Sequence, residues 1–201
     1  MKIYLSRHGQ SRWQVSINEE GLDSPLTELG QNQAQYLANW LANDAALNNG
    51  TRVDVAHLRV SPLIRAQQTA VPIAEMLGAT AVTDKTLRET DFHIEPQLPT
   101  VVSPYQNHIP YTPTNEYAAF KEQAQAALLT LVAAAEFHNG SVLAVTHGGL
   151  ISTILRMIVG TDAISFQICN ASLNLIEWKG GRWHLVHLNL WDHLPTAMRT
   201  F

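Results

Sequence analysis

Apolar and polar positions along the first part of the chain predict strands that alternate with helices. Ile3 and Leu5 alternate with polar neighbours and predict a first short strand. Further strand-like stretches lie at 53–60 and near 80–83. Apolar residues recur at helical spacing over 27–43, with Ala34, Leu37, Ala38, Leu41 and Ala42 on one face.

Residues that favour helix ends support these boundaries. Thr27 precedes the first helix and is a candidate N-cap. Ser61 followed by Pro62 is typical of an N-cap and a first helical position, so a second helix is expected from there to about Leu77. Gly78 then suits the position just after a helix, where a left-handed backbone is common.

The second part of the chain repeats the alternation and then changes to a hairpin. A helix is expected over 114–138, and the continuous apolar run 142–145 is typical of a central parallel strand that is buried on both faces. A helix over 150–159 follows, and then two strands near 171–178 and 183–190 flank a glycine-containing turn. The sequence therefore predicts an α/β fold, a three-layer αβα sandwich with a mostly parallel central sheet and a C-terminal hairpin.

The segment 92–116 interrupts this pattern. It holds five of the nine prolines and no glycine, so neither a long helix nor a central strand fits it. We interpret it as a proline-rich lid inserted into one domain that spans 1–201, with a plain surface loop as the alternative. His93, Tyr105, His108 and Tyr111 are candidates for substrate contacts, although each alone is more typical of a lid or surface position.

Composition narrows the class of protein. The chain has 201 residues, a formal net charge of −4 and one cysteine, Cys169. An intrachain disulfide is therefore excluded, and a basic surface for nucleic acid is not supported. The longest apolar stretch, 126–135, is too short to span a membrane, which needs about 20 residues. With no apolar leader at the start, we expect a cytoplasmic protein that binds neither nucleic acid nor membrane.

Polar clusters follow the predicted strands. Arg7, His8 and Gly9 come after the first strand, Arg65 lies shortly after the second, and 146–149 follow the apolar run. Ligands of open α/β sheets bind at these carboxyl ends. Two arginines suit a phosphate dianion because each can donate bidentate hydrogen bonds, and the helix start at Gly148 and Gly149 adds free N–H groups.

The histidines in these clusters suggest phosphoryl transfer. A neutral imidazole can accept a phosphoryl group, and nearby cations favour that neutral form. A second histidine held against the phosphate would instead stay protonated. The reaction also needs an acid for the departing oxygen, and Glu89 is favoured over Asp91 and Glu95.

These motifs together resemble the histidine phosphatase superfamily, in its phosphoglycerate-mutase-like branch. The resemblance runs along nearly the whole chain and is carried by a series of motifs in order, at 7–13, 23–34, 61–70, 87–92 and 146–149. A lone Arg-His-Gly would be weak evidence, whereas the ordered set is strong. The resemblance implies a phosphoglycerate-mutase-like fold and a single domain of that family.

The resemblance also implies roles for individual residues. His8 would be the nucleophile, and Glu89 would protonate the leaving group and then activate water. Arg7, Arg65 and His147 would bind the phosphoryl group. Further phosphate or substrate contacts would come from Ser11, Arg12, Gln14 and Gly148. No metal or cofactor is implied, because the arginines supply the positive charge.

Two positions depart from the family pattern. Gln14 stands where the family often has asparagine, which puts its phosphate contact in doubt. After Glu89 the family often continues with glycine and an acidic stretch, whereas this chain has Phe92 to Pro96. The lid is therefore expected to leave the core differently.

The function that fits best is a metal-independent phosphatase for a small phosphorylated metabolite. A phosphoglycerate mutase is the alternative, but 92–116 contains no lysine or arginine for a second acidic group. A protein phosphatase and a catalytically weak binding protein of the same fold also remain open. Relatives are often dimers, so a homodimer is expected.

Overall fold

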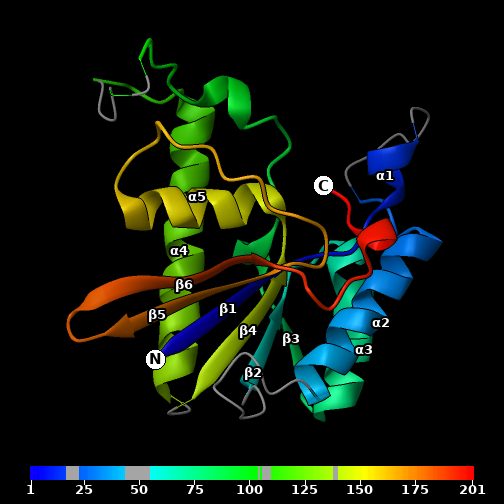
Figure 1. The fold of residues 1–201 in the computed structure, drawn as a ribbon. Coiled ribbons are helices and arrows are strands. Elements are labelled where there is room, and N and C mark those ends of the chain that lie inside the picture. Colours follow the sequence, from blue (N-terminus) through cyan, green and yellow to red (C-terminus); the bar gives the residue numbers. More distant parts are fainter. Residues whose placement is uncertain (17–22, 44–54, 104, 106–109, 138–139) are drawn as a thin grey trace.

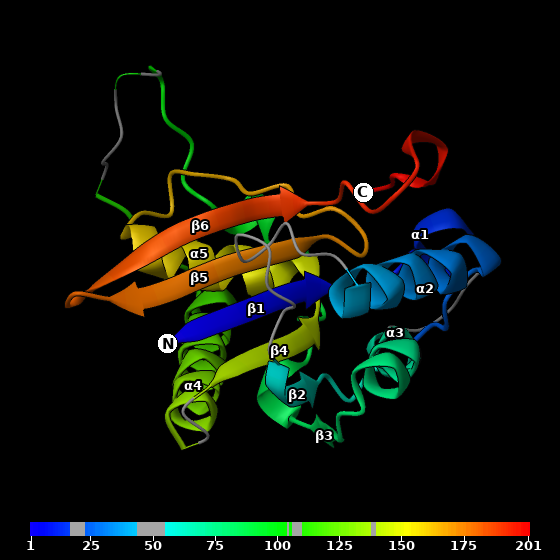
Figure 2. The ribbon, with the colours of Figure 1, turned by 60° about the horizontal axis from the view of Figure 1, so that its bottom comes forward.

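The computed structural model describes residues 1–16, 23–43, 55–103, 105, 110–137 and 140–201. Its centre is a six-stranded sheet in the order β3-β2-β4-β1-β5-β6. The strands are β1 Lys2–Arg7, β2 Val55–Val60, β3 Ala81–Thr83, β4 Ser141–Thr146, β5 Leu173–Lys179 and β6 Arg182–Leu190. The first four run parallel, and β5 and β6 are antiparallel to their neighbours, as Figure 2 shows across the width of the sheet.

Helices cover both faces of this sheet (Figure 1). Helices α2 (Glu28–Asn43) and α3 (Ile64–Leu77) pack on one face, and α4 (Asn115–Phe137) and α5 (Gly148–Val159) pack on the other. A single-turn helix, α1 (Arg12–Val15), follows β1, and short 3₁₀ turns form η1 (Lys85–Leu87), η2 (Glu95–Gln97) and η3 (Thr196–Met198). The predicted three-layer α/β fold is confirmed.

Two apolar cores lie on either side of the sheet. Alternate residues of β1 point to opposite faces, so Ile3 and Leu5 join the core under α4 and α5, while Tyr4 joins the core under α2 and α3. Strand β4 divides its side chains in the same way. The pattern explains why 142–145 is apolar at every position, since both faces of a central strand are buried.

The local signals for helix ends are only partly confirmed. The Thr27 hydroxyl accepts from the Gly30 N–H at 3.0 Å, and Gly78 ends α3 with a left-handed φ of 62°. The expected start of α3 is wrong, because the helix begins at Ile64. The Ser61 hydroxyl accepts from the Leu63 N–H but is otherwise turned toward His147, so it serves the site rather than the helix.

Other parts of the sequence pattern can be placed as well. Gly180 and Gly181 both have positive φ and join β5 to β6. In the proline-rich segment, Phe92, Ile94 and Leu98 pack against the core beside α4 and α5. Positions 53, 54, 104, 106–109 and 138 of the predicted segments lie outside the described residues. No helix in the described part of the chain is long and apolar enough to cross a membrane.

Candidate active site

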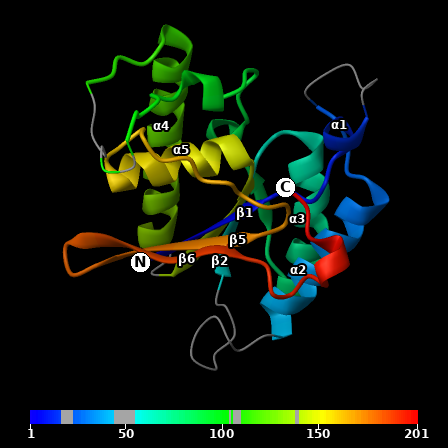
Figure 3. The same ribbon diagram turned by 45° about the horizontal axis from the view of Figure 1, so that its top comes forward.

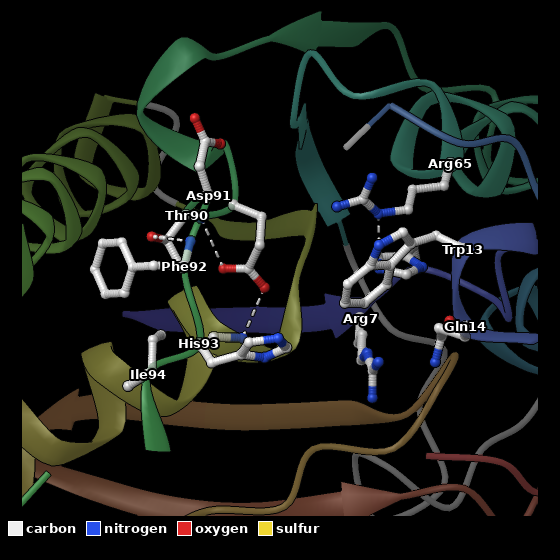
Figure 4. Close-up of a pocket in the computed structure, with 12 residues that line it drawn as sticks. Arg7, Trp13, Gln14, Arg65, Thr90, Asp91, Phe92, His93 and Ile94 are labelled. Atoms are coloured by element: carbon white, nitrogen blue, oxygen red, sulfur yellow. Dashed lines mark hydrogen bonds between the residues drawn. The ribbon is translucent and has the colours of Figure 1, made fainter. Parts of the chain in front are cut away.

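The parallel register brings the predicted motifs together at one end of the sheet. Arg7, the last residue of β1, pairs with Thr146, the last of β4. The His8 N–H then donates to the Thr146 carbonyl at 3.0 Å, and the Ser61 N–H donates to the Val145 carbonyl at 3.0 Å. The loops that follow β1, β2 and β4 therefore leave the sheet side by side. A cavity of about 220 Å³ opens there (Figure 4).

His8 lies at the bottom of this cavity with a fixed tautomer. Its Nδ1 is 2.6 Å from the Gly9 carbonyl, which can only accept, so Nδ1 carries the proton. The lone pair is then on Nε2, where the Arg65 Nε–H donates to it at 3.1 Å. Burial, followed by the charges of Arg7 and Arg65, lowers the pKa of His8 well below its ordinary 6.5. The ring is thus neutral and nucleophilic.

Two glycines hold the His8 loop against the helices. A Cβ on Gly9 would lie 2.3 Å from the Gly30 carbonyl oxygen, so only glycine allows the two backbones this close. The Gly9 N–H also donates to the Thr69 hydroxyl of α3 at 3.1 Å. The loop after β1 is therefore pinned to both α2 and α3, which fixes the direction of the His8 ring.

Arg7 and Arg65 supply the positive charge of the site. Arg7 Nη1 donates to the Ile168 carbonyl at 2.5 Å, whereas its Nε has no hydrogen-bond partner among the described residues. Burial lowers the pKa of Arg7 to about 10, so the side chain stays charged at neutral pH. Burial also lowers the pKa of Arg65. Both arginines line the cavity beside His8 and suit a phosphate dianion.

Glu89 lines the same cavity as His8. Its carboxylate accepts from the Gly149 N–H at 2.9 Å and from the Thr90 N–H at 3.2 Å. Burial raises the pKa of Glu89 above its usual value. A raised pKa favours the protonated form that a general acid needs.

The alternative acids are less suitably placed. Asp91 lines the cavity but forms an ion pair of 2.9 Å with Arg88, and both side chains are exposed. Glu95 is exposed and does not line this cavity. The geometry therefore favours Glu89, as the sequence predicted.

His147 is close to His8 but does not line the cavity. The ring centroids of the two histidines are 5.1 Å apart, and His147 Nε2 lies 2.7 Å from the Ser61 hydroxyl. Its Nδ1 has no partner in the part of the chain that the structure describes. Burial, with the neighbouring His8 and Arg65, lowers the pKa of His147 well below 6.5. Its neutral form is favoured here, in contrast to the protonated form expected from the sequence, and a bound phosphate dianion would act in the opposite direction.

Several other predicted contacts lie outside the cavity. Ser11 is fully buried, and its backbone and side chain form the start of α1. Arg12 is exposed and does not line the cavity. Gly148 lies behind Arg7, where a Cβ would be 3.4 Å from Arg7 Nε. Tyr105 is exposed, and Tyr111 donates its hydroxyl to the Gln97 carbonyl away from His8.

Gln14 lines the cavity, yet its amide is already engaged. Gln14 Nε2 donates to Asn170 Oδ1 at 3.0 Å and to the Phe201 carbonyl at 2.8 Å, while its Oε1 accepts from the Ser11 N–H. Asn170 in turn donates to the His8 carbonyl at 3.2 Å. A phosphate contact from Gln14 would have to break this arrangement, so the structure supports a positioning role for Gln14 and Asn170.

Sequence reasoning gave no role to several residues that shape the site. Trp13, Thr90, Phe92 and Ile94 line the cavity, although the motifs around them were identified. Ser61 and Thr69 contact the histidine loops, as described above. The only signal for these residues in the sequence was that they lie in or next to the motifs. Which of their side chains faces the cavity depends on the fold. The described residues contain no group of three or more His, Cys, Asp or Glu that could hold a metal ion.

Comparison with known proteins identifies the family. The model of the histidine phosphatase superfamily (branch 1) matches residues 3–190. The chain belongs to this superfamily. A curated relative, the probable phosphoglycerate mutase GpmB of Yersinia pestis, is 28% identical over 197 residues, which cover 91% of this chain and 87% of that protein.

Solved structures of the superfamily share the fold. YhfR of Bacillus stearothermophilus has a TM-score of 0.71 and 25% identity, over 96% of this chain and 98% of that one. A phosphoserine phosphatase mutant from Entamoeba histolytica, solved in complex with phosphoserine, has a TM-score of 0.70 and 21% identity, over 96% of this chain and 99% of that one. A mycobacterial glucosyl-3-phosphoglycerate phosphatase in complex with VO3 has a TM-score of 0.65 and 24% identity, over 94% and 99% of the two chains.

Proposed function

We propose that this superfamily member is a metal-independent phosphatase that hydrolyses a small phosphate monoester through a phosphohistidine on His8. One observation carries the proposal. The Nε2 lone pair of a neutral His8 faces the same cavity as two arginines and a buried carboxyl with a raised pKa, Glu89. Nucleophile, charge stabilisation and general acid are thus present together.

In the first step the phosphoryl group lies between Arg7 and Arg65. His8 Nε2 attacks phosphorus, a P–N bond forms, and the bond from phosphorus to the ester oxygen breaks. Glu89 donates its proton to that oxygen, and the alcohol leaves. The Arg65 N–H, which donates to His8 Nε2 in this structure, then donates to a phosphoryl oxygen instead and stabilises the charge of the transition state.

In the second step the Glu89 carboxylate takes a proton from water. The water oxygen attacks phosphorus, the P–N bond breaks, and inorganic phosphate leaves with His8 neutral again. Glu89 is then protonated for the next cycle. Its hydrogen bond from the Gly149 N–H, at the start of α5, stabilises the carboxylate between the steps.

A phosphoglycerate mutase is the second candidate, and the names of the curated relatives favour it. It would need a further cation for the carboxylate of its substrate. Among the described residues that line the cavity, the guanidinium groups are those of Arg7 and Arg65, which the phosphoryl group would occupy. The lack of a further guanidinium group in the cavity lining supports hydrolysis over the mutase reaction.

The decisive test is a panel of phosphate monoesters with EDTA present. 3-Phosphoglycerate is included, and both free phosphate and 2-phosphoglycerate are followed. We expect phosphate release that is insensitive to EDTA and is lost in His8→Ala, together with loss of the phosphoenzyme. Isomerisation without release would establish the mutase instead, and near-normal turnover in His8→Ala would overturn the mechanism.

We also propose a cellular location, a type of partner and an oligomeric state for the enzyme. We expect its partner to be a small phosphorylated metabolite in the cytoplasm, with neither nucleic acid nor membrane bound. We also expect a homodimer, which size-exclusion chromatography with light scattering would test. A protein phosphatase would be recognised by faster turnover of phosphopeptides than of small esters.

A further inference from the structure

Two aromatic side chains stand at the mouth of the cavity. Trp13, on α1, is 46% exposed, and His93, on the segment after β3, is exposed as well. Their rings are stacked, with centroids 6.5 Å apart and an angle of 28° between the planes. Both line the cavity that holds His8 and Glu89 (Figure 4). Segments far apart in the sequence thus present two nearly parallel rings beside the reaction centre.

The centroid separation of 6.5 Å lies within the range of offset-stacked rings that interact directly. Carbon atoms in contact are about 3.5 Å apart, so a flat ring held between two others needs roughly 7 Å between the outer rings. The two rings stack on each other in this structure, so they must first move apart to take up a substrate ring. A small outward rotation of two exposed side chains would admit a third ring between them.

The backbones that carry the rings are held in place. The Trp13 N–H donates to the Ser24 hydroxyl at 2.7 Å. On either side of His93, Phe92 and Ile94 turn the other way and pack against the core, Phe92 with its edge against Phe120 at 6.1 Å. Figure 4 shows Phe92 and Ile94 on one side of the strand-like segment and His93 on the other. The rings can therefore rotate while their attachment points stay fixed.

Charge in the cavity disfavours a second anionic group on the substrate. Of the described lining residues, Arg7 and Arg65 carry guanidinium groups, and both lie beside His8. Of the acidic side chains there, Glu89 is the proposed acid and Asp91 pairs with Arg88. A second anionic group of the substrate would therefore find no further guanidinium group among the described residues that line the cavity.

We propose that Trp13 and His93 clamp an aromatic ring of the substrate that lies within one or two bonds of the ester oxygen. The substrate class is an aryl or arylmethyl phosphate monoester without a further negative charge. This assignment rests on the proposed phosphatase function. It makes Trp13 and His93 specificity-determining residues, because stacking on both faces selects flat rings over saturated ones.

Benzyl phosphate and cyclohexylmethyl phosphate provide the matched test. Both are esters of primary alcohols of similar size, so they differ mainly in the flatness and aromatic character of the ring. We expect kcat/KM for benzyl phosphate to be roughly five- to tenfold higher, as one to two stacking contacts would give. Equal values for the two esters would overturn the clamp. 3-Phosphoglycerate should be a poorer substrate than benzyl phosphate, and the reverse order would also overturn the assignment.

Variants then locate the preference. In Trp13→Leu and in His93→Ala the benzyl to cyclohexylmethyl ratio should fall toward one, whereas Trp13→Phe should keep most of it. Trp178→Leu is the matched control, since Trp178 is 41% exposed on the distant β5 and its loss should leave the ratio unchanged. A ratio that survives both Trp13→Leu and His93→Ala would place the preference elsewhere and refute the clamp.

A binding measurement separates this proposal from the catalytic one. Calorimetry with the His8→Ala protein compares the Kd of the same two esters without turnover. Tighter binding of benzyl phosphate, lost in His8→Ala/Trp13→Leu, supports the clamp even if the wild-type protein releases no phosphate. Equal Kd values overturn the clamp even if the protein is an active phosphatase.

Discussion

His8 and Glu89 show how one physical cause prepares two groups for opposite roles. Burial disfavours the charged form of each side chain, so it lowers the pKa of the histidine and raises that of the carboxyl. The histidine therefore lacks the proton that would block its lone pair, and the protonated form that the leaving group needs becomes more favourable for the carboxyl. The nearby arginines act further on His8 in the same direction.

The pH dependence of turnover follows from these two shifts. Because the pKa of His8 lies well below 6.5, kcat/KM should persist to pH values below that of an ordinary histidine. It should fall as the pH rises through the raised pKa of Glu89, where the acid loses its proton. The pH profile of kcat/KM for an alkyl ester checks this, and an acid limb at the ordinary pKa of histidine would contradict it.

Substitution of the acid should depend on the leaving group. Glu89→Gln keeps the acceptor for the Gly149 N–H but removes the proton, so alkyl esters should lose about 10²-fold or more in kcat. An activated ester such as 4-nitrophenyl phosphate needs little protonation and should lose much less. Asp91→Asn is the matched control. Equal losses on both ester types in Glu89→Gln would count against Glu89 as the acid.

Acid should destabilise the folded protein through the buried histidines. His8 and His147 have lowered pKa values in the folded chain, so below the ordinary 6.5 the unfolded chain binds more protons. Their contribution to stability is therefore present above about pH 6.5 and is lost as the pH falls toward the folded pKa values. Urea unfolding at about pH 7.5 and about pH 5.5 measures this, and His147→Gln should reduce the difference.

Among the elements, those with strong local signals could be predicted from the sequence. The apolar run of β4, the N-cap Thr27 and the glycine that ends α3 were all identified, because propensity and tertiary packing agree there. The start of α3 was misplaced because the Ser61 hydroxyl, a typical cap, contacts His147, the residue between β4 and α5. Tertiary contact overrode the local preference.

The same distinction applies to the site. The identities of His8, Arg7, Arg65 and Glu89 followed from the motifs, since the chemistry requires those residue types. Other features of the site did not follow from the motifs. These are the hydrogen bonds that occupy the Gln14 amide, the position of His147 outside the cavity lining and the contact of Trp13 with the cavity. Each depends on distances between segments that are remote in the sequence, and the pattern along the chain does not contain those distances.

Helix α2 and the loop after β1 meet at a contact that a single methyl group should disrupt. A Cβ at Gly30 would lie 2.0 Å from the Gln10 carbonyl oxygen, a backbone atom that no side-chain rotation can move away. Alanine usually stabilises a helix interior relative to glycine, but here we expect Gly30→Ala to lower the free energy of unfolding by about 2–3 kcal/mol. Turnover should fall as well, because the displaced loop carries His8.

A control on α3 isolates the steric effect. Gly78 has a φ of 62° and open space around it, so Gly78→Ala should cost only about 1 kcal/mol and leave turnover intact. Urea unfolding and ester turnover of both variants provide the comparison. A Gly30→Ala protein that is as stable as the parent would show that the two backbones are not in fixed contact.

At the scale of the whole molecule, distant segments brace the site. Arg7 donates to the carbonyl of Ile168, and Gln14 donates to that of Phe201. Gln33 of α2 donates to the Met198 carbonyl and accepts from the Gln10 N–H, which links the last residues to the His8 loop. Figure 3 shows these last residues beside α2. The C-terminal part of the described chain thus supports the reaction centre.

The pairing of β1 with β4 joins Lys2 to Ser141 and brings Arg7 next to Thr146. Contacts between such remote positions form late, because closing a long loop costs entropy before the strands can pair. During refolding, helices α2 and α4 can therefore form while the chain has no reaction centre at all. Catalytic activity should return only with the final, slow association of the central strands, which makes it a stricter measure of the native state than helix content.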